Sequence, residues 1–263
     1  MPRTSRKLPL ALAGVFLLPV VAKALVWSFE PLRHWQDARW VSAGMLPPAA
    51  DDPTARVTVF AARTAGLRGI LAVHTWIAVK PQNADHYDRY EVTGWGRPLR
   101  VNALAADSLW IGSRPDIIGD VRGPLAASAI PKIESAIRDY PHADYGSYRL
   151  WPGPNSNTFV ATVLRAAPEL GIAMPPEAIG KDFRADGSFV GLTESETGIE
   201  ASLFGILGLK IGWVEGIEVN FLGLVAGIDA RHPALKIPAF GRIGLDSFTA
   251  FAATENTKKG SSP

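Results

Sequence analysis

The segment Trp151–Phe159 reads WPGPNSNTF, and it decides how the second half of the chain is interpreted. Its prolines and glycine predict a turn, after which Asn155 and Ser156 stand where a helix begins, because both residue types are favoured N-caps. Beyond them, NTFVATVLRAAPELG carries apolar residues at the spacing of one helix face, which predicts a helix running to about Ala166. The backbone N–H groups at a helix start attract negative charge, so Ser156 is placed as a nucleophile would be.

Upstream of this turn, alternating apolar and polar residues predict a hairpin of strands. The strand segments are RVTVFAAR (Arg56–Arg63), ILAVHTWIAVK (Ile70–Lys80) and RYEVTGWG (Arg89–Gly96). LRVNALA, SLWIGS and GSYRLW are shorter strand candidates, and IPKIESAIRDY (Ile130–Tyr140) reads as a helix with Pro131 in its first turn. We therefore predict an α+β fold, in which helices pack on an antiparallel sheet, plus an N-terminal apolar helix.

The N-terminus has the pattern of an export signal. Arg3, Arg6 and Lys7 precede the apolar run Leu8–Ala22, which continues after Lys23 to Trp27. This pattern is typical of an uncleaved anchor, and a cleaved signal peptide is the alternative. In both cases the following domain is exported. We expect a bacterial inner-membrane protein with its domain in the periplasm or outside, and a membrane as partner of the N-terminal segment.

Composition shifts divide the chain into four parts. Residues 1–30 form the anchor or signal, and residues 31–55 form a tryptophan-containing segment followed by the proline-rich linker AGMLPPAADDPTA. Residues 56–250 form a single α+β domain, and residues 251–263 form a polar tail that we expect to be disordered.

The composition excludes several classes of function. The 263-residue chain has no cysteine, so it has no disulfide, thiolate metal site or cysteine nucleophile. Its five histidines form no pair with metal-ligand spacing, and we expect no metal and no cofactor. A net charge of +2 without a basic stripe argues against nucleic-acid binding.

The glycine-rich run Phe204–Asp229 is apolar enough to suggest a second membrane segment. Lys210, Glu215 and Glu218 argue against that, because charges at mid-bilayer are costly and nothing in the pattern pairs them. We predict strands or loops of the soluble domain instead. The neighbouring pair Lys181–Asp182 is interpreted as a surface ion pair of little energetic consequence.

Four residues are candidates for chemistry. His74 lies in the apolar strand segment and is a candidate general base, and Ser156 is the candidate nucleophile. Glu91, on the returning strand, is the candidate third group that orients the imidazole. Asn155 either caps the helix or helps to bind an oxyanion. The structural alternatives are a core histidine, a helix cap and a solvated carboxylate.

Two resemblances extend this reading. The runs HTWIAVK, YEVTGWG, WPGPNSNTF and IGKD, with the apolar segment after Ala201, resemble a bacterial family catalogued as a domain of unknown function. A histidine on a strand followed by an Asn-nucleophile pair and a Phe is similar to the circularly permuted papain-like (NlpC-type) hydrolases, whose later segment reads N-C-x-x-F. His74, Asn155 and Phe159 match that order, whereas Ser156 occupies the position of the cysteine. The resemblance implies a permuted papain-like core and an acyl-transfer site.

Two functions follow as hypotheses. The first is a Ser/His-dependent hydrolase or acyltransferase of the cell envelope, acting on an amide, thioester or ester of a peptide or lipid. The second is a catalytically silent papain-like domain that binds a peptide, a lipid or a partner protein.

Overall fold

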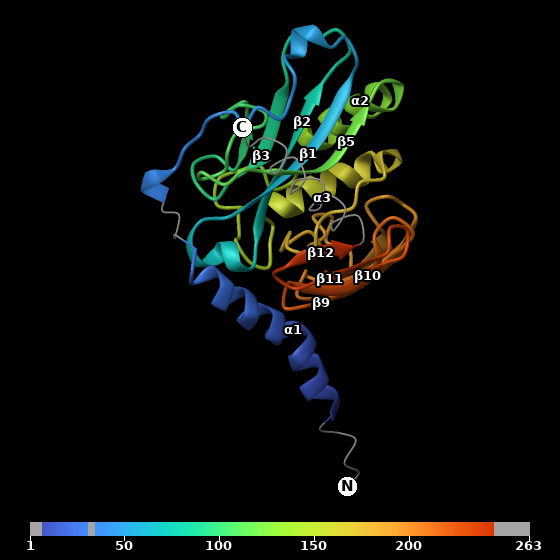
Figure 1. The fold of residues 1–263 in the computed structure, drawn as a ribbon. Helices are drawn as coiled ribbons and strands as arrows, with labels where there is room; N and C mark the ends of the chain where they lie inside the picture. Colours follow the sequence, from blue (N-terminus) through green and yellow to red (C-terminus); the bar gives the residue numbers. More distant parts are fainter. Residues whose placement is uncertain (1–6, 31–34, 245–263) are drawn as a thin grey trace, which may run out of the picture.

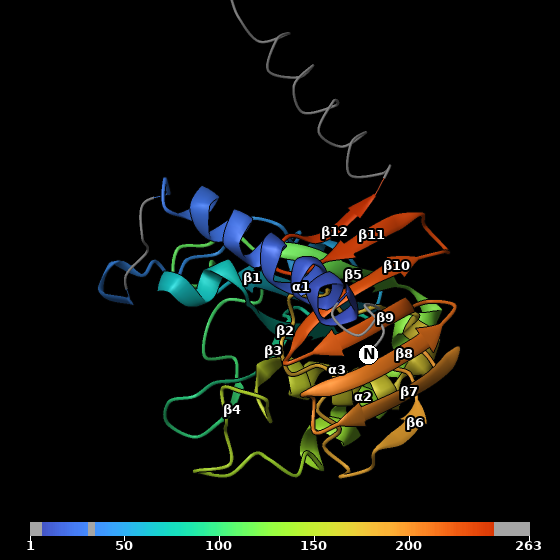
Figure 2. The ribbon, with the colours of Figure 1, turned by 90° about the horizontal axis from the view of Figure 1, so that it is seen from below.

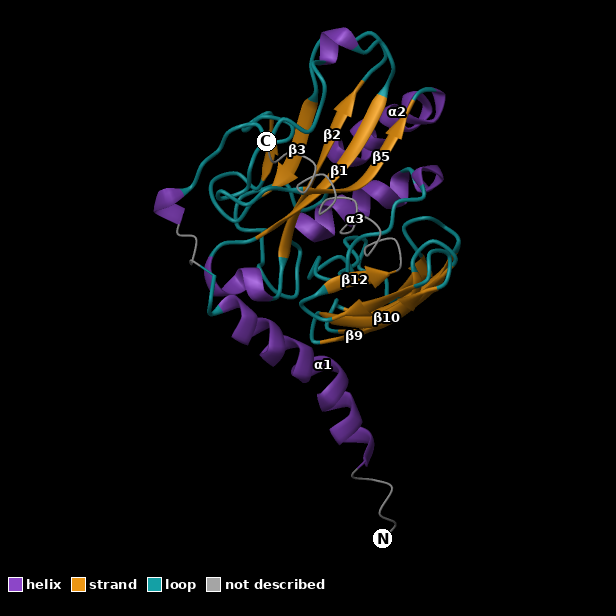
Figure 3. Cartoon of the chain, in the orientation of Figure 1, coloured by secondary structure: helices purple, strands orange, loops and turns teal. Residues whose placement is uncertain are grey.

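Two antiparallel sheets and three α-helices make up the part of the chain that the computed structural model describes, residues 7–30 and 35–244 (Figures 1 and 3). The helices are α1 (Lys7–Trp27), α2 (Pro124–Arg138) and α3 (Ser156–Ala166). In Figure 1, α3 lies between the two sheets. The prediction of an α+β fold is confirmed, although it foresaw one sheet instead of two.

The first sheet has five strands in the spatial order β4-β3-β2-β1-β5. They are β1 (Arg56–Arg63), β2 (Val73–Lys80), β3 (Asp88–Val92), β4 (Leu99–Val101) and β5 (Asp116–Arg122). The predicted strand at Arg56–Arg63 is confirmed at both ends. The predicted strand at Ile70–Lys80 begins three residues later, because Gly66–Ile70 forms a 3-10 turn.

The two faces of this sheet pack against different parts of the chain. Val59 and Ile77 belong to a core that includes Ile133 of α2 and Phe159 of α3. Successive residues of a strand point to opposite faces of the sheet. On the face opposite Val59 and Ile77, Trp76 belongs to a second hydrophobic core. Helices thus cover one face of the sheet, and loops rich in tryptophan cover the other.

Helix α2 differs from its prediction. It begins at Pro124 instead of Ile130, so Pro131 lies inside the helix and not in its first turn. Proline inside a helix removes one backbone hydrogen bond. Its ring is exposed, while the apolar stripe from Ala126 to Ile137 is buried on both sides of it. Burial of this stripe outweighs the lost hydrogen bond, so the helix continues through the proline.

The second sheet has seven strands that follow one another in space as they do in sequence. They are β6 (Val190–Leu192), β7 (Gly198–Leu203), β8 (Leu207–Gly212), β9 (Gly216–Phe221), β10 (Leu224–Asp229), β11 (Ala234–Ile237) and β12 (Gly241–Gly244). The prediction that Phe204–Asp229 forms strands is confirmed. Two of the shorter predicted strands are wrong. GSYRLW forms a loop in which Arg149 N–H donates to Pro154 O, and SLWIGS forms only isolated bridges.

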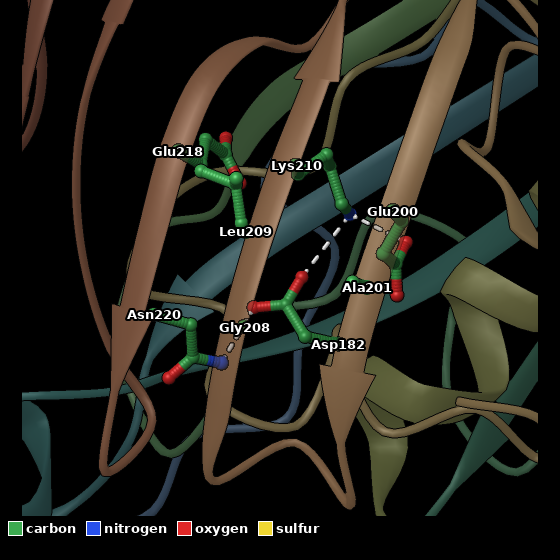
Figure 4. Close-up of a pocket in the computed structure, with 8 residues that line it drawn as sticks. All are labelled: Asp182, Glu200, Ala201, Gly208, Leu209, Lys210, Glu218 and Asn220. Atoms are coloured by element: carbon green, nitrogen blue, oxygen red, sulfur yellow. Dashed lines mark hydrogen bonds and ion pairs between the residues drawn. The ribbon is translucent and has the colours of Figure 1, made fainter. Parts of the chain in front are cut away.

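A layer of buried charges joins this sheet to α3. Arg165 of α3 donates to Glu200 of β7 at 2.7 Å and to Glu194 at 2.8 Å. Lys210 of β8 lies 3.1 Å from Asp182 and 3.2 Å from Glu200 (Figure 4). Burial of a charge is tolerated where an opposite charge and hydrogen bonds compensate it, and here Arg165 and Lys210 each meet at least two carboxylates.

The interpretation of Lys181–Asp182 as a surface pair is wrong. Both residues are buried, because each finds a partner on the second sheet: Lys181 contacts Glu218, and Asp182 contacts Lys210. Glu218, which the sequence left without a partner, contacts Lys236 as well. Glu215 accepts hydrogen bonds from the backbone and hydroxyl of Ser195.

The N-terminal region lies against the domain. Phe16 of α1 is buried against Phe221 of β9, with ring centroids 5.6 Å apart. The segment expected to be a linker packs as well, since Asp107 accepts from Met45 N at 2.6 Å and Ala49 is buried. Among the residues described, no helix has the length and apolar character needed to cross a membrane. The predicted disordered tail, 251–263, lies outside the described residues.

Candidate functional site

The turn before α3 is built around Asn155. Its side-chain oxygen accepts from the N–H groups of Asn157 and Thr158, and the Thr158 hydroxyl accepts from Asn155 N–H, which together form a capping box. Its Nδ2 donates to Leu150 O and Ile179 O, each at 3.0 Å. Both amide protons are therefore used, so the geometry favours the capping role of Asn155 over an oxyanion role.

Asn157 ties the start of α3 to β2. Its Nδ2 donates to Val73 O at 3.0 Å, and its Oδ1 accepts from the Thr75 hydroxyl at 2.9 Å. Thr75 Oγ1 also lies 3.4 Å from Ser156 O. The beginning of β2 and the beginning of α3 are thus joined on either side of His74, although 82 residues separate His74 from Ser156 in the sequence.

His74 sits on β2 beyond the end of its pairing with β3, which covers Ile77 to Val79. Its ring stacks on Trp110, with centroids 3.6 Å apart, and its Nε2 lies 2.9 Å from Glu91 Oε2. Burial lowers the pKa of His74 below its usual value, and this outweighs the opposing effect of Glu91. The imidazole is therefore neutral at pH 7.

Glu91 is buried, which argues against the alternative that it is a solvated hairpin carboxylate. Burial alone would raise its pKa, but the hydrogen bond with His74 and the charge of Arg89 lower the pKa of Glu91 to about 2. Arg89 donates to the same oxygen at 2.8 Å and lies over the ring of Trp76. Glu91 is held as a carboxylate by two partners.

The tautomer of His74 follows from this contact. An ionised carboxylate only accepts hydrogen bonds, so Nε2 carries the proton that Glu91 receives. In a neutral ring the other nitrogen, Nδ1, is then an acceptor. Within the described chain, Nδ1 has no hydrogen-bond partner. A general base requires such a nitrogen, oriented by a carboxylate behind it.

His74 and Ser156 line one cavity of about 450 Å³. The other lining residues are mainly apolar or aromatic: Trp35, Leu71, Val73, Trp95, Trp110, Ile111, Tyr148, Leu150, Trp151 and Ile179. Neither the Ser156 hydroxyl nor the Tyr148 hydroxyl makes a hydrogen bond to any residue the structure describes. Arg68 also lines the cavity and adds a positive charge to its wall.

The four predicted residues have different places in this site. His74 and Ser156 both line the cavity, and Asn155 lines it while it caps α3. Glu91 lies behind His74, with which it shares a hydrogen bond, and does not line this cavity. Arg89 was not predicted. Its position two residues before Glu91, on the same face of a strand, is the sequence signal that can identify it.

The described residues contain no group of histidine, aspartate and glutamate side chains that could hold a metal ion.

One family model matches part of the chain. No curated protein and no solved structure matches the chain. Residues 54–183 match the family described as "Protein of unknown function (DUF3750)". The matched range holds β1–β5, α2, α3 and nearly all of the cavity wall, and this part of the chain is therefore identified as a domain of unknown function.

Proposed function

We propose that the cavity is the active site of a Ser/His-dependent hydrolase or acyltransferase. The observation that carries the proposal is that His74 and Ser156 line one cavity, and that neither His74 Nδ1 nor Ser156 Oγ has a hydrogen-bond partner among the residues the structure describes. The resemblance to the permuted papain-like hydrolases, in which a strand histidine precedes an Asn–nucleophile pair at a helix start, supports the proposal.

In this mechanism Ser156 Oγ attacks the carbonyl carbon of an ester, thioester or amide while His74 Nδ1 takes its proton. Glu91 stabilises the imidazolium that forms, and Arg89 keeps Glu91 ionised. The tetrahedral intermediate collapses when His74 gives the proton to the leaving group, leaving an acyl-serine ester. Water or another acceptor, deprotonated by His74, then attacks the acyl-serine carbonyl; the bond to Ser156 Oγ breaks, and His74 returns the proton to Ser156.

The oxyanion requires hydrogen-bond donors. Asn157 N–H and Thr158 N–H are bound by Asn155, so Ser156 N–H is the donor left at the helix start. The Tyr148 hydroxyl is the second donor in the proposal. Removing one such donor typically costs about 100- to 1,000-fold in rate.

The wall of the cavity favours an apolar acyl group. Its residues are mostly aromatic and aliphatic, as in sites that bury an apolar ligand and orient it with few polar groups. We propose a lipid-like acyl ester or amide as substrate in preference to a polar peptide.

The second candidate is a catalytically silent binding domain. It is supported by the low solvent exposure of His74 and Ser156, 4% each, because only a small part of each residue is accessible from solvent. This candidate predicts a bound apolar molecule and no covalent intermediate.

Labelling of the full chain with a fluorophosphonate distinguishes the two candidates. We expect labelling of the wild type, loss in Ser156→Ala and His74→Ala, and no change in Ser128→Ala on the exposed side of α2. An unlabelled wild type would favour the silent domain.

A cysteine variant gives an independent test, because the chain has no other thiol. In Ser156→Cys a thiol beside His74 should alkylate well below the ordinary thiol pKa of about 8.5, whereas Ser128→Cys should show the ordinary profile. His74→Ala in the same chain should restore the ordinary profile. If both cysteines react alike, His74 and residue 156 do not form a shared site.

We also propose that the chain is held at a membrane by its N-terminal segment, with the domain exported. The basic residues before α1 and its exposed leucines and valines support this. A reporter enzyme active only after export, fused at the C-terminus, should be active, and an inactive but intact fusion would contradict export.

A further inference from the structure

One face of the seven-stranded sheet is apolar at each outward position of β6 to β11. Among the residues described there, no charged side chain points to this side. The most exposed members are Val190, Leu192, Ile199, Leu203, Leu207, Leu209, Ile211, Ile217, Val219, Phe221, Ile228 and Leu235. We call this set the outer face.

The outer face reverses the usual arrangement of a sheet with one solvated side. Such a sheet alternates apolar residues inward with polar residues outward. Here Glu200, Lys210 and Glu218 point inward to the charge layer, while Ile199, Leu209 and other apolar neighbours on the same strands point outward. A shift of one residue would exchange the two sides, so the reversal is fixed by the register.

The extent of the outer face is too large for a surface that meets only water. Its side chains expose between 40% and 66% of their area. Together they present on the order of 1,000 Å² of apolar surface, whereas the largest patch of a monomeric soluble protein is roughly 300–600 Å². The outer face is therefore expected to be covered by another phase or molecule.

Helix α1 continues the outer face. Phe16 packs on Phe221, the last residue of β9 and a member of the outer face. Leu18 and Leu25, on other sides of the helix, are 68% and 62% exposed. In Figure 1, α1 extends below the seven-stranded sheet, on the side opposite α3, and Figure 2 looks onto this side with α1 in front. An apolar helix and an apolar sheet face thus require the same surroundings.

We infer that the outer face, together with the exposed sides of α1, lies on a lipid bilayer. A helix that is apolar all round is typical of an apolar surrounding such as lipid. A second copy of the sheet fits less well, because α1 projects beyond the outer face and would separate two flat sheets. Lipid can adapt to both the helix and the sheet.

The margins of the outer face agree with this orientation. Trp213, in the turn between β8 and β9, is 63% exposed, and tryptophan is enriched where a membrane meets water. Trp151 of the cavity wall donates to Leu222 O, in the turn between β9 and β10, at 3.0 Å. The cavity wall and the edge of the outer face are therefore in direct contact.

Site-specific fluorescence tests the inference on the full chain. Leu209→Cys and Ile217→Cys are labelled with an environment-sensitive fluorophore and mixed with vesicles of phosphatidylcholine and phosphatidylglycerol that carry nitroxide lipids. Ser128→Cys on α2 is the matched control. We expect a blue shift and loss of most emission at positions 209 and 217, and no change at position 128.

Three other outcomes overturn the inference. If the label at 209 keeps its emission while the chain binds vesicles, α1 binds lipid and the outer face does not. If the label is shielded without vesicles and this depends on protein concentration, a second copy covers the face. Equal quenching at 128 means non-specific adsorption. The test does not depend on the catalytic proposal, because Ser156→Ala should give the same quenching.

Discussion

The replacement Asn155→Ala tests how the start of α3 is held. Loss of an N-cap costs about 1 kcal/mol. The variant also loses the hydrogen bonds to Leu150 O and Ile179 O, at roughly 0.5–1.5 kcal/mol each. Ile179 O keeps its bond from Asn157 Nδ2, at 2.8 Å, so it is not left unsatisfied. We therefore expect the free energy of unfolding to fall by about 2–4 kcal/mol.

The assay is urea unfolding of the full chain in a mild detergent, followed by circular dichroism. Thr162→Ala is the control, because it removes one side-chain hydrogen bond in the same helix, to Thr158 O, and leaves the cap intact. It should cost under about 1 kcal/mol. If Asn155→Ala unfolds at the wild-type midpoint with an unchanged slope, or if the control costs as much, the account of the cap is wrong.

Three further predictions concern buried residues of the first sheet and of the contacts around α3. Gly180→Ala should destabilise the chain by at least about 2 kcal/mol, since Gly180 has φ +98° and a Cβ there would lie 2.3 Å from Asn155 Nδ2; a wild-type melting temperature would contradict this. Phe159→Ala should cost about 3–5 kcal/mol in urea unfolding, because its ring is fully buried; a loss under 1 kcal/mol would show that the core closes around the gap. Glu91 has a pKa lowered to about 2, so its stabilisation is complete above its ordinary pKa of about 4.5 and is lost as the pH falls toward 2. In Glu91→Gln the urea midpoint should be lower at pH 7 and should change less between pH 5 and 3 than in the wild type; parallel profiles would exclude this role.

Local patterns were sufficient where one face of an element is buried against a single layer. The predicted bounds of β1 are those observed, because RVTVFAAR alternates between residues that meet α2 and α3 and residues of more mixed type on the other face, although that face is buried as well. The start of α3 was also predictable, since Asn155 caps it through local contacts alone. Helix α2 was predicted too short, because its burial comes from the sheet and compensates for a proline that local rules treat as a boundary.

Long-range pairing explains what the sequence did not reveal. Lys181 and Glu218 are 37 residues apart, and no pattern along the chain indicates that they meet in a buried layer. The same holds for Glu91, which looked like an exposed hairpin residue until Arg89 and His74 were placed beside it. Residue type and spacing identified His74 and Ser156 as candidates, but only the arrangement of β2 and α3 shows that they line one cavity.

The charge layer also determines where the chain can be divided. The family match ends at residue 183, directly after Lys181 and Asp182, whereas their partners Glu218 and Lys210 lie in strands outside it. A fragment ending there would lose these counter-charges together with the strands that bury them, and Arg165 of α3 would lose Glu200 of β7 in the same way. The limits of the sequence family are therefore not the limits of an autonomous folding unit, and the two sheets are expected to unfold in one cooperative transition.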